Sequence, residues 1–348
     1  MPGRREAPGI RLFSAVAGGT AAVVWIHDGY AAHAAVQTKR RLAMRAKRDH
    51  ALVFWLFLAP VLFAFVMVLV VPFVLGFWYS FTSWSSDARD LSGIHFRGLS
   101  NYVVSLKDPA FLYSFLITSG YTLVNMVVVN VVSFGLALLV TSKLKGRNFF
   151  RAGFFVPNLI GGLILGYVWQ FIFNSAIPEL GVFFGIKAWA DPNNLMLARS
   201  FPALIAIVIA GTWQYAGYIM MIYVAAIENV PVELHEAAQI DGAGPFRRLV
   251  AITLPMASQA FTITLFLTLV NSFKQFDVNI SLTAGGPSTI FMGKPIFGTE
   301  LLAMNIYNTA FRSDYLAEGQ ARAVIFFVVL AIVATIQVYA NKKREIEL

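Results

Sequence analysis

Residues 236–242 read EAAQIDG and residues 252–255 read ITLP, and this pair of stretches decides how the chain is organised. Both stretches lie in a polar segment between two runs that are long and apolar enough to cross a bilayer as helices. Pro231 suits the first turn of a helix, Gly242 suits a left-handed stop, and Pro245 suits the start of a second helix. We therefore expect a helix–turn–helix loop at 228–255 that joins two membrane spans.

The composition points to an integral membrane protein. Of the 348 residues, 58% are hydrophobic and 13% are charged, whereas soluble domains carry about 25% charged residues. Continuous apolar runs of spanning length lie near 53–80, 116–142, 152–173, 201–227, 257–282 and 321–341. These features predict an all-α, polytopic membrane protein with six transmembrane helices within 51–341, an N-terminal extension at 1–50 and a tail at 342–348.

Basic residues predict the orientation of the spans, because short loops rich in Lys and Arg stay in the cytoplasm. They cluster before the first span, between the second and third spans and after the last span: Arg45, Lys47, Arg48, Lys143, Lys145, Arg147, Arg151, Lys342, Lys343 and Arg344. We therefore expect both termini and the loop 228–255 in the cytoplasm. The net charge of +9 flanks the spans and does not form a patch interleaved with aromatic residues, which disfavours nucleic acid as a partner.

The first 50 residues contain one short apolar run at 12–26, which is below the length of a comfortable span. We expect this region to be a surface or disordered extension. Met44 directly precedes a basic flank at 45–48, so it is a candidate start of translation.

The sequence lacks the motifs of several kinds of chemistry. There is no cysteine, and the five histidines are scattered, so a metal site is not expected. A phosphate-binding loop requires Gly, four residues and then Gly-Lys-Ser/Thr, and neither this motif nor a Gly-x-Ser-x-Gly or His-Glu-x-x-His motif is present. We expect a non-enzymatic chain without a catalytic residue or a cofactor of its own.

The loop resembles the EAA loop of permease subunits of bacterial ATP-binding-cassette importers. The similarity rests on Glu236, Ala237, Ala238, Asp241, Gly242, Ala243, Ile252, Leu254 and Pro255. The form Asp-Gly-Ala is similar to the carbohydrate branch of that family, although Leu249 stands where Phe is common. Stretches at 96–102, 151–157, 272–277, 282–287 and 306–311 resemble the maltose- and glycerol-phosphate-type first permease, so the resemblance covers 50–345.

This resemblance implies a type I importer transmembrane domain in the bacterial inner membrane that forms half of a sugar translocation pathway. Its implied partners are a second permease subunit, an extracytoplasmic sugar-binding protein and two ATPase subunits, which would bind ATP and Mg²⁺. The EAA loop would act as a coupling helix that docks on one ATPase. An ATP-independent secondary transporter or channel for a polar solute is the alternative, but such carriers typically show inverted repeats, and we find none in the sequence.

Polar side chains within the expected spans are candidates for the substrate pathway, because such groups are costly in lipid and usually face a bundle interior or a wet cavity. Asn271, Gln275 and Asn279 recur at four-residue spacing and would line one face of a continuous helix. The other candidates are Asn125, Trp213, Gln214, Tyr215 and Tyr218. Hydrogen bonding between helices is the alternative role for each of these polar groups.

Two further groups are expected to be structural. Lys274 and Asp277, three residues apart, would neutralise one another on a helix. The glycines of the third span would let neighbouring helices approach closely; they are Gly161, Gly162 and Gly166.

Overall fold

The computed structural model describes residues 14–17, 20–23, 53–85, 94–142 and 145–342. The chain divides into two compact units, Met1–Val74 and Leu75–Leu348, with the boundary inside the apolar helix Val53–Tyr79. In the first unit, β1 (Ser14–Ala17) and β2 (Thr20–Val23) form an antiparallel hairpin. Met44 and the rest of the expected extension lie outside the described residues.

Six membrane spans are present if each of two bent helix pairs counts as one span. Four single helices are long and apolar enough: Val53–Tyr79, α4 (Pro109–Thr141), α9 (Ser200–Glu228) and α16 (Leu316–Lys342). The bent pairs are Arg147–Leu159 with Gly162–Phe184, at 100°, and Pro245–Met256 with Ser258–Phe273, at 70°. The predicted all-α, six-helix membrane fold is therefore confirmed.

Shorter elements make up the rest of the described chain, and they include parts of the first span and of the two bent pairs. They are η1 (Val66–Val70), α2 (Val71–Tyr79), α3 (Ser100–Lys107), α5 (Arg147–Phe155), η3 (Val156–Leu159), α6 (Gly162–Phe171), η4 (Ile172–Ala176), α7 (Ile177–Phe184), α8 (Lys187–Ala190), η5 (Pro192–Asn194), η6 (Met196–Ala198), α10 (Val232–Ile240), α11 (Pro245–Arg248), η7 (Leu249–Thr253), α12 (Leu254–Met256), α13 (Ser258–Phe273), α14 (Asp277–Leu282), β3 (Ser288–Phe291), β4 (Lys294–Phe297), α15 (Leu302–Tyr307) and η8 (Asn308–Arg312).

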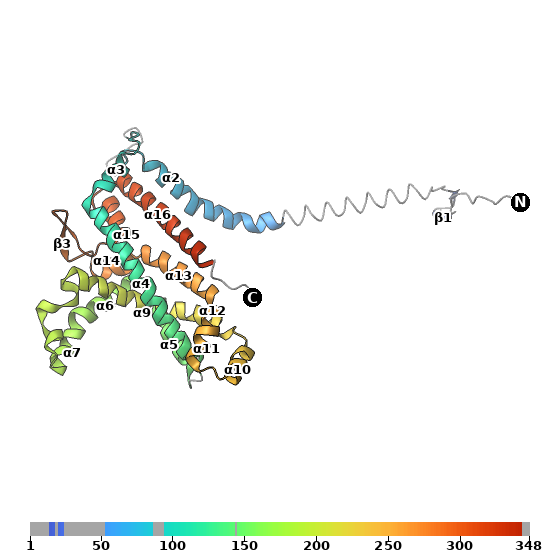
Figure 1. The fold of residues 1–348 in the computed structure, drawn as a ribbon. Coiled ribbons are helices and arrows are strands. Elements are labelled where there is room, and N and C mark those ends of the chain that lie inside the picture. The colour runs from blue at the N-terminus through green and yellow to red at the C-terminus, as the bar shows by residue number, and fades with distance from the viewer. Residues whose placement is uncertain (1–13, 18–19, 24–52, 86–93, 143–144, 343–348) are drawn as a thin grey trace. The chain divides into compact units, whose positions relative to one another are not determined.

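The helices α4, α9 and α13 form the centre of the second unit (Figure 1). Around Tyr223 of α9, buried apolar side chains from these three helices form one core cluster. A second cluster joins α4 and α9 to α6 and α14, with Leu165 and Leu282 fully buried within it. Helices α10 and α11 lie near one end of α4, and α3 lies at the other end.

The second span starts earlier than hydropathy predicts. Helix α4 begins at Pro109, whereas the apolar run was expected from 116. Asp108 caps the helix, since its Oδ1 accepts a hydrogen bond from the backbone nitrogen of Ala110 at 3.1 Å. Aspartate before proline is a strong helix start, so capping and not hydropathy sets this boundary.

The third span is bent between η3 and α6. Pro157 lies in η3, and the chain turns at Ile160 and Gly161, both of which have extended backbone angles. Glycines nearby permit close packing, as predicted: a Cβ on Gly162 would lie 2.7 Å from Asp277 Cβ, and one on Gly166 would overlap Ser281 Oγ. The prediction fails at Gly161, where no atom lies within 4 Å of such a Cβ.

The expectation of one continuous fifth helix at 257–282 is wrong. Helix α13 ends at Phe273, and α14 begins only at Asp277. In the intervening segment Phe276 has φ −132° and ψ −55°, which is not helical. Asn271, Gln275 and Asn279 therefore do not share one helix face, because the four-residue spacing applies only within a continuous helix.

Residues 288–297 form a β-hairpin that the sequence did not predict. Strands β3 and β4 pair antiparallel, with Phe291 opposite Lys294. The two turn residues, Met292 and Gly293, have φ values of 51° and 77°. Positive φ at both positions is the geometry of a tight type I′ hairpin turn.

Candidate functional site

The loop 228–255 contains the expected two helices with a left-handed glycine between them. Helix α10 ends in a Schellman motif: the amide of Gly242 donates to the carbonyl of Gln239 at 3.0 Å, and that of Ala243 donates to the carbonyl of Ala238 at 2.8 Å. Gly242 has φ +77°, a conformation that favours glycine. The chain then enters α11, η7 and α12, which carry Ile252, Leu254 and Pro255 and lead into α13.

The surface of α10 presents an apolar stripe with a carboxylate at its middle. Val232, Glu236 and Ile240 are four residues apart, so they lie along one line of the helix. All three side chains are exposed, with Ile240 at 87% and Val232 at 61%. Large exposed apolar side chains on a polar loop mark a surface suited to contact with another molecule.

Three of the predicted pathway residues take part in hydrogen bonds between elements. Asn125 Nδ2 donates to Ser272 Oγ at 2.8 Å, and Gln214 Nε2 donates to the carbonyl of Ile160 at 3.2 Å. Asn279 is fully buried; it donates to the carbonyl of Thr299 and accepts from the amide of Leu301. For Gln214 and Asn279 these hydrogen bonds favour the structural role that was the alternative interpretation.

Polar atoms of three buried side chains converge on Gly211 of α9. A Cβ placed on this glycine would lie 3.2 Å from Tyr121 Oη, 3.6 Å from Asn125 Oδ1 and 3.7 Å from Gln275 Nε2. Asn125 Oδ1 has no hydrogen-bond partner within the described part of the chain. Gln275 lies in the break between α13 and α14, so the break brings its amide to this cluster.

Lys274 and Asp277 do not form the expected ion pair: no ion pair joins them in the described residues, and both are exposed. The reason is the end of α13 at Phe273, which removes the helical spacing between them. Asn271, Tyr215 and Tyr218 are partly exposed.

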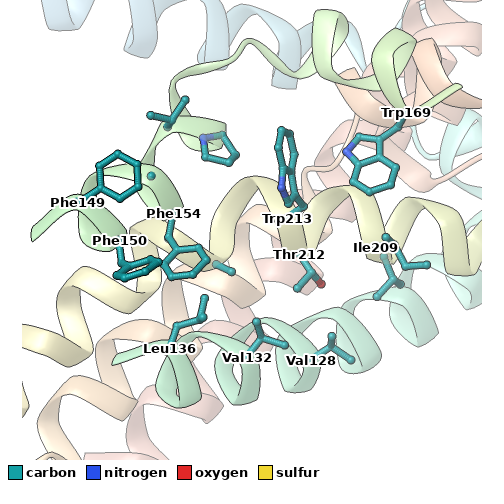
Figure 2. A pocket seen from close by; sticks show the side chains of 16 residues that line it. Val128, Val132, Leu136, Phe149, Phe150, Phe154, Trp169, Ile209, Thr212 and Trp213 are labelled. Carbon is teal, nitrogen blue, oxygen red and sulfur yellow. The ribbon is translucent and has the colours of Figure 1, made fainter. Parts of the chain in front are cut away.

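Trp213 lines an apolar cavity of about 700 Å³ (Figure 2). Its ring meets that of Trp169 edge to face, with centroids 5.8 Å apart. The cavity lies between α4, α5, α6 and α9. Two buried polar atoms on its lining residues, Trp169 Nε1 and Thr212 Oγ1, lack a hydrogen-bond partner among the described residues.

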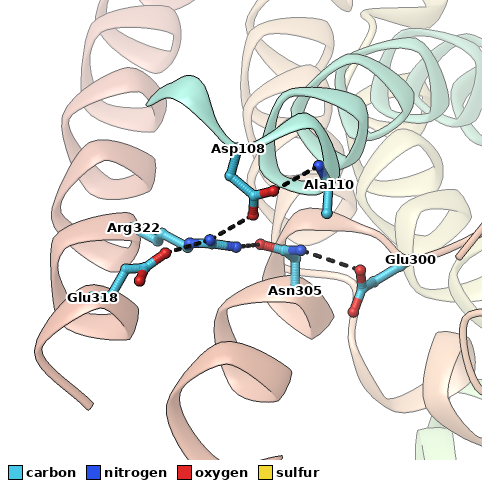
Figure 3. A network of polar contacts seen from close by, with 6 residues as sticks. All are labelled: Asp108, Ala110, Glu300, Asn305, Glu318 and Arg322. Atoms are coloured by element: carbon cyan, nitrogen blue, oxygen red, sulfur yellow. Dashed lines mark hydrogen bonds and ion pairs between the residues drawn. The ribbon is translucent and has the colours of Figure 1, made fainter. Parts of the chain in front are cut away.

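A buried charged network at the other end of the second unit was missed from the sequence (Figure 3). The Arg322 guanidinium donates to Asp108 at 2.6 Å, to Glu318 at 2.5 Å and to Asn305 Oδ1 at 2.6 Å. Asn305 in turn donates to Glu300 at 3.1 Å. The signal was available, because an arginine inside an apolar run is costly unless it is paired.

The described residues contain no group of three or more His, Cys, Asp or Glu that could hold a metal ion.

Comparison with known proteins agrees with this architecture. Residues 42–346 match the family described as binding-protein-dependent transport system inner membrane component. A probable starch degradation products transport system permease protein, AmyD of Thermoanaerobacterium thermosulfurigenes, is 40% identical over 85% of this chain and 96% of its own length. The trehalose/maltose transport system permease protein MalF of Thermococcus litoralis is 30% identical over 83% of this chain and 93% of its own length.

Among solved structures, the bacterial alginate ABC transporter in complex with an alginate pentasaccharide-bound periplasmic protein matches with a TM-score of 0.68 and 19% identity. The match covers 85% of this chain and 96% of that one, which supports the fold. The relatives are transport subunits and not enzymes. The chain therefore belongs to the family of inner membrane components of binding-protein-dependent transport systems, the permease subunits of ATP-binding-cassette importers.

Proposed function

We propose that the chain forms half of the translocation pathway of an ATP-driven sugar importer and couples to an ATPase through α10. The exposed stripe of Val232, Glu236 and Ile240 carries this proposal, because an apolar helix face around one carboxylate fits a groove with apolar walls and a basic residue. The Schellman motif supports the proposal further, because it fixes the turn by which the chain leaves α10.

Sugar is the proposed substrate class because AmyD is named for starch degradation products and MalF for trehalose and maltose. The partners in this proposal are a second permease, two ATPase subunits that hold ATP and Mg²⁺, and an extracytoplasmic sugar-binding protein. A periplasmic protein bound to a pentasaccharide accompanies the similar alginate transporter, in line with the last of these. The distribution of Lys and Arg supports cytoplasmic placement of both termini.

A matched pair of isoleucines tests the docking. Ile240 on α10 and Ile290 on β3 are 87% and 78% exposed. In detergent extracts of the native membrane, Ile240→Asp should lose co-purification of a P-loop ATPase, since it places a charge on the stripe, while Ile290→Asp should keep it. Retention of the ATPase by both variants would count against docking through α10.

For the substrate pathway we propose the polar cluster at Gly211, with Asn125 and Gln275. Tyr215 and Tyr218, about one and two turns further along α9, belong to the same proposal. Amides can both donate to and accept from sugar hydroxyls, and aromatic rings can cover a sugar face. Asn271, also partly exposed, and Trp213, in its separate aromatic cavity, belong to the same proposal. Asn279 is left out, because hydrogen bonds within the fold use both its amide nitrogen and its oxygen, and Gln214 is left out because its amide bonds to the carbonyl of Ile160. Asn125 is kept, because its Oδ1 has no partner among the described residues.

Gly211→Ala tests this pathway by placing a methyl group among the three polar atoms. We expect KM for maltodextrin uptake to rise about tenfold, the effect of ~1.4 kcal/mol from one lost hydrogen bond, without loss of the ATPase. Gly120→Ala is the control, because no atom lies within 4 Å of a Cβ there. An unchanged KM in Gly211→Ala would remove the cluster from the pathway.

A further inference from the structure

The root of the EAA loop is the connection between the end of α9 and the start of α10. Helix α9 ends at Glu228, and α10 begins at Val232 after a three-residue connection. The C-terminal end of a helix carries a partial negative charge, so a carboxylate there is unfavourable on local grounds. A nearby cation would therefore favour the position of Glu228, whose side chain is 47% exposed.

Arg151 of α5 supplies this cation. Its Nη2 lies 2.5 Å from Glu228 Oε1 and donates at 3.2 Å to the carbonyl of Val140. Val140 lies in the last turn of α4, where carbonyls have no partner within the helix. One guanidinium thus joins α4, α5 and α9 at the root of the loop.

The packing between α5 and α9 is uneven along their length. Where the helices touch, Gly217 lies so close to the carbonyl of Phe154 that a Cβ would overlap it. Beside Arg151, a cavity of about 620 Å³ opens between them, lined by Phe155, Tyr218 and Met221 among others. Because apolar packing is interrupted here, the ion pair, with the Arg151 side chain 18% and the Glu228 side chain 47% exposed, bridges the two helix ends beside the cavity.

We propose that Arg151 is a positioning residue for energy coupling. Through Glu228 and Val140 it fixes the root of the EAA loop to α4 and α5, so that a displacement of α10 moves three helices as one body. The pair stays closed throughout the transport cycle. This inference rests on the proposed docking of α10 on an ATPase.

The test uses the assembled transporter in liposomes and measures maltodextrin uptake per ATP hydrolysed. Arg151→Gln and Glu228→Gln should each lower this ratio at least fivefold. The charge-reversed pair Arg151→Glu with Glu228→Arg should recover at least half of the original ratio, which a merely structural loss would not do. Arg147→Gln is the control, because Arg147 lies one turn earlier on α5 and is exposed.

Single variants with the original ratio, or a reversed pair as poor as the singles, would overturn the inference. Co-purification separates this failure from failure of the proposed function. If the unmodified chain brings down no ATPase, docking itself is wrong; if it does and the Arg151 variants stay coupled, only the role of Arg151 is wrong.

The absence of cysteine allows a second test of the closed pair. In the double variant Arg151→Cys with Glu228→Cys, the two cysteines can be joined by a bis-methanethiosulfonate reagent. Its spacer should match the distance that the paired side chains of Arg151 and Glu228 span. Before joining, this variant lacks the ion pair and should be poorly coupled, and joining should restore the uptake per ATP hydrolysed. Transport that is lost on joining and restored by a reductant would show that the two ends must separate, which contradicts the proposal.

Discussion

Replacing Gly242 with alanine isolates one property of the EAA loop, its left-handed turn. The residue has φ +77°, and a Cβ there would meet no atom within 4 Å. The cost is therefore conformational and not steric, and a left-handed conformation costs a residue with a side chain about 1–2 kcal/mol. This corresponds to a shift of about 5–30-fold in the equilibrium between the closed and the frayed turn.

Gly244 provides a control two residues away. A Cβ at this position also meets no atom within 4 Å, but the backbone has φ −65° and ψ 165°, which any residue adopts. Gly244→Ala should therefore change the stability of the turn by no more than about 0.5 kcal/mol. Gly242→Asn should fall between the two alanine variants, because asparagine tolerates the left-handed region better than other residues with side chains.

Hydrogen exchange of the amides at 242 and 243 measures this equilibrium directly, since both donate to carbonyls of α10 in the closed turn. We expect exchange about 5–30 times faster in Gly242→Ala and unchanged in Gly244→Ala. ATP-driven uptake should fall only in the first variant. Equal exchange in the two alanine variants would refute the view that the left-handed glycine stabilises the loop.

Two further predictions concern the packing of the second unit, and thermal unfolding in detergent measures both. Arg322→Met should lower stability by about 1–3 kcal/mol, because it removes a buried guanidinium from the partly buried carboxylates of Asp108 and Glu318. Arg312→Gln, at an exposed arginine, should change stability little, and equal effects of the two variants would contradict the argument. Gly166→Ala should lower stability by about 1–3 kcal/mol through overpacking against Ser281, and adding Ser281→Gly should relieve the overpacking. The control Gly135→Ala, where no atom lies within 4 Å of a Cβ, should leave stability unchanged, and a similar loss there would refute the packing explanation.

Hydropathy predicted the number of spans, because the free energy of crossing a bilayer depends on the total apolar content of about 20 residues. It did not predict where helices begin or break. Asp108 starts α4 early through a side-chain cap, and the chain leaves the helix after Phe273, inside the run 257–282 that was expected to be one span. Such boundaries depend on single hydrogen bonds and backbone angles, which an average over a window does not contain.

The loop could be predicted in more detail than the spans. Pro231, Gly242 and Pro245 act through local backbone preferences, so their effects are contained in the sequence itself. The polar residues of the spans behave differently, because their roles depend on which helices become neighbours. Gln214 and Asn279 bond within the fold, whereas Asn125 keeps one oxygen unpaired beside Gly211. Spacing alone cannot separate these outcomes.

The bend of the third span lies between the two proposed sites. On one side, α5 is joined through Arg151 to the root of the EAA loop. On the other side, Gly162 and Gly166 pack α6 against α14, which follows directly after the segment that carries Gln275. The carbonyl of Ile160, at the bend, accepts the hydrogen bond from Gln214. If α10 docks on an ATPase as proposed, a movement of the loop reaches Gly211 and Asn125 along α9 and α4 themselves. It reaches Gln275 through this bend, since close packing makes α6 and α14 move together.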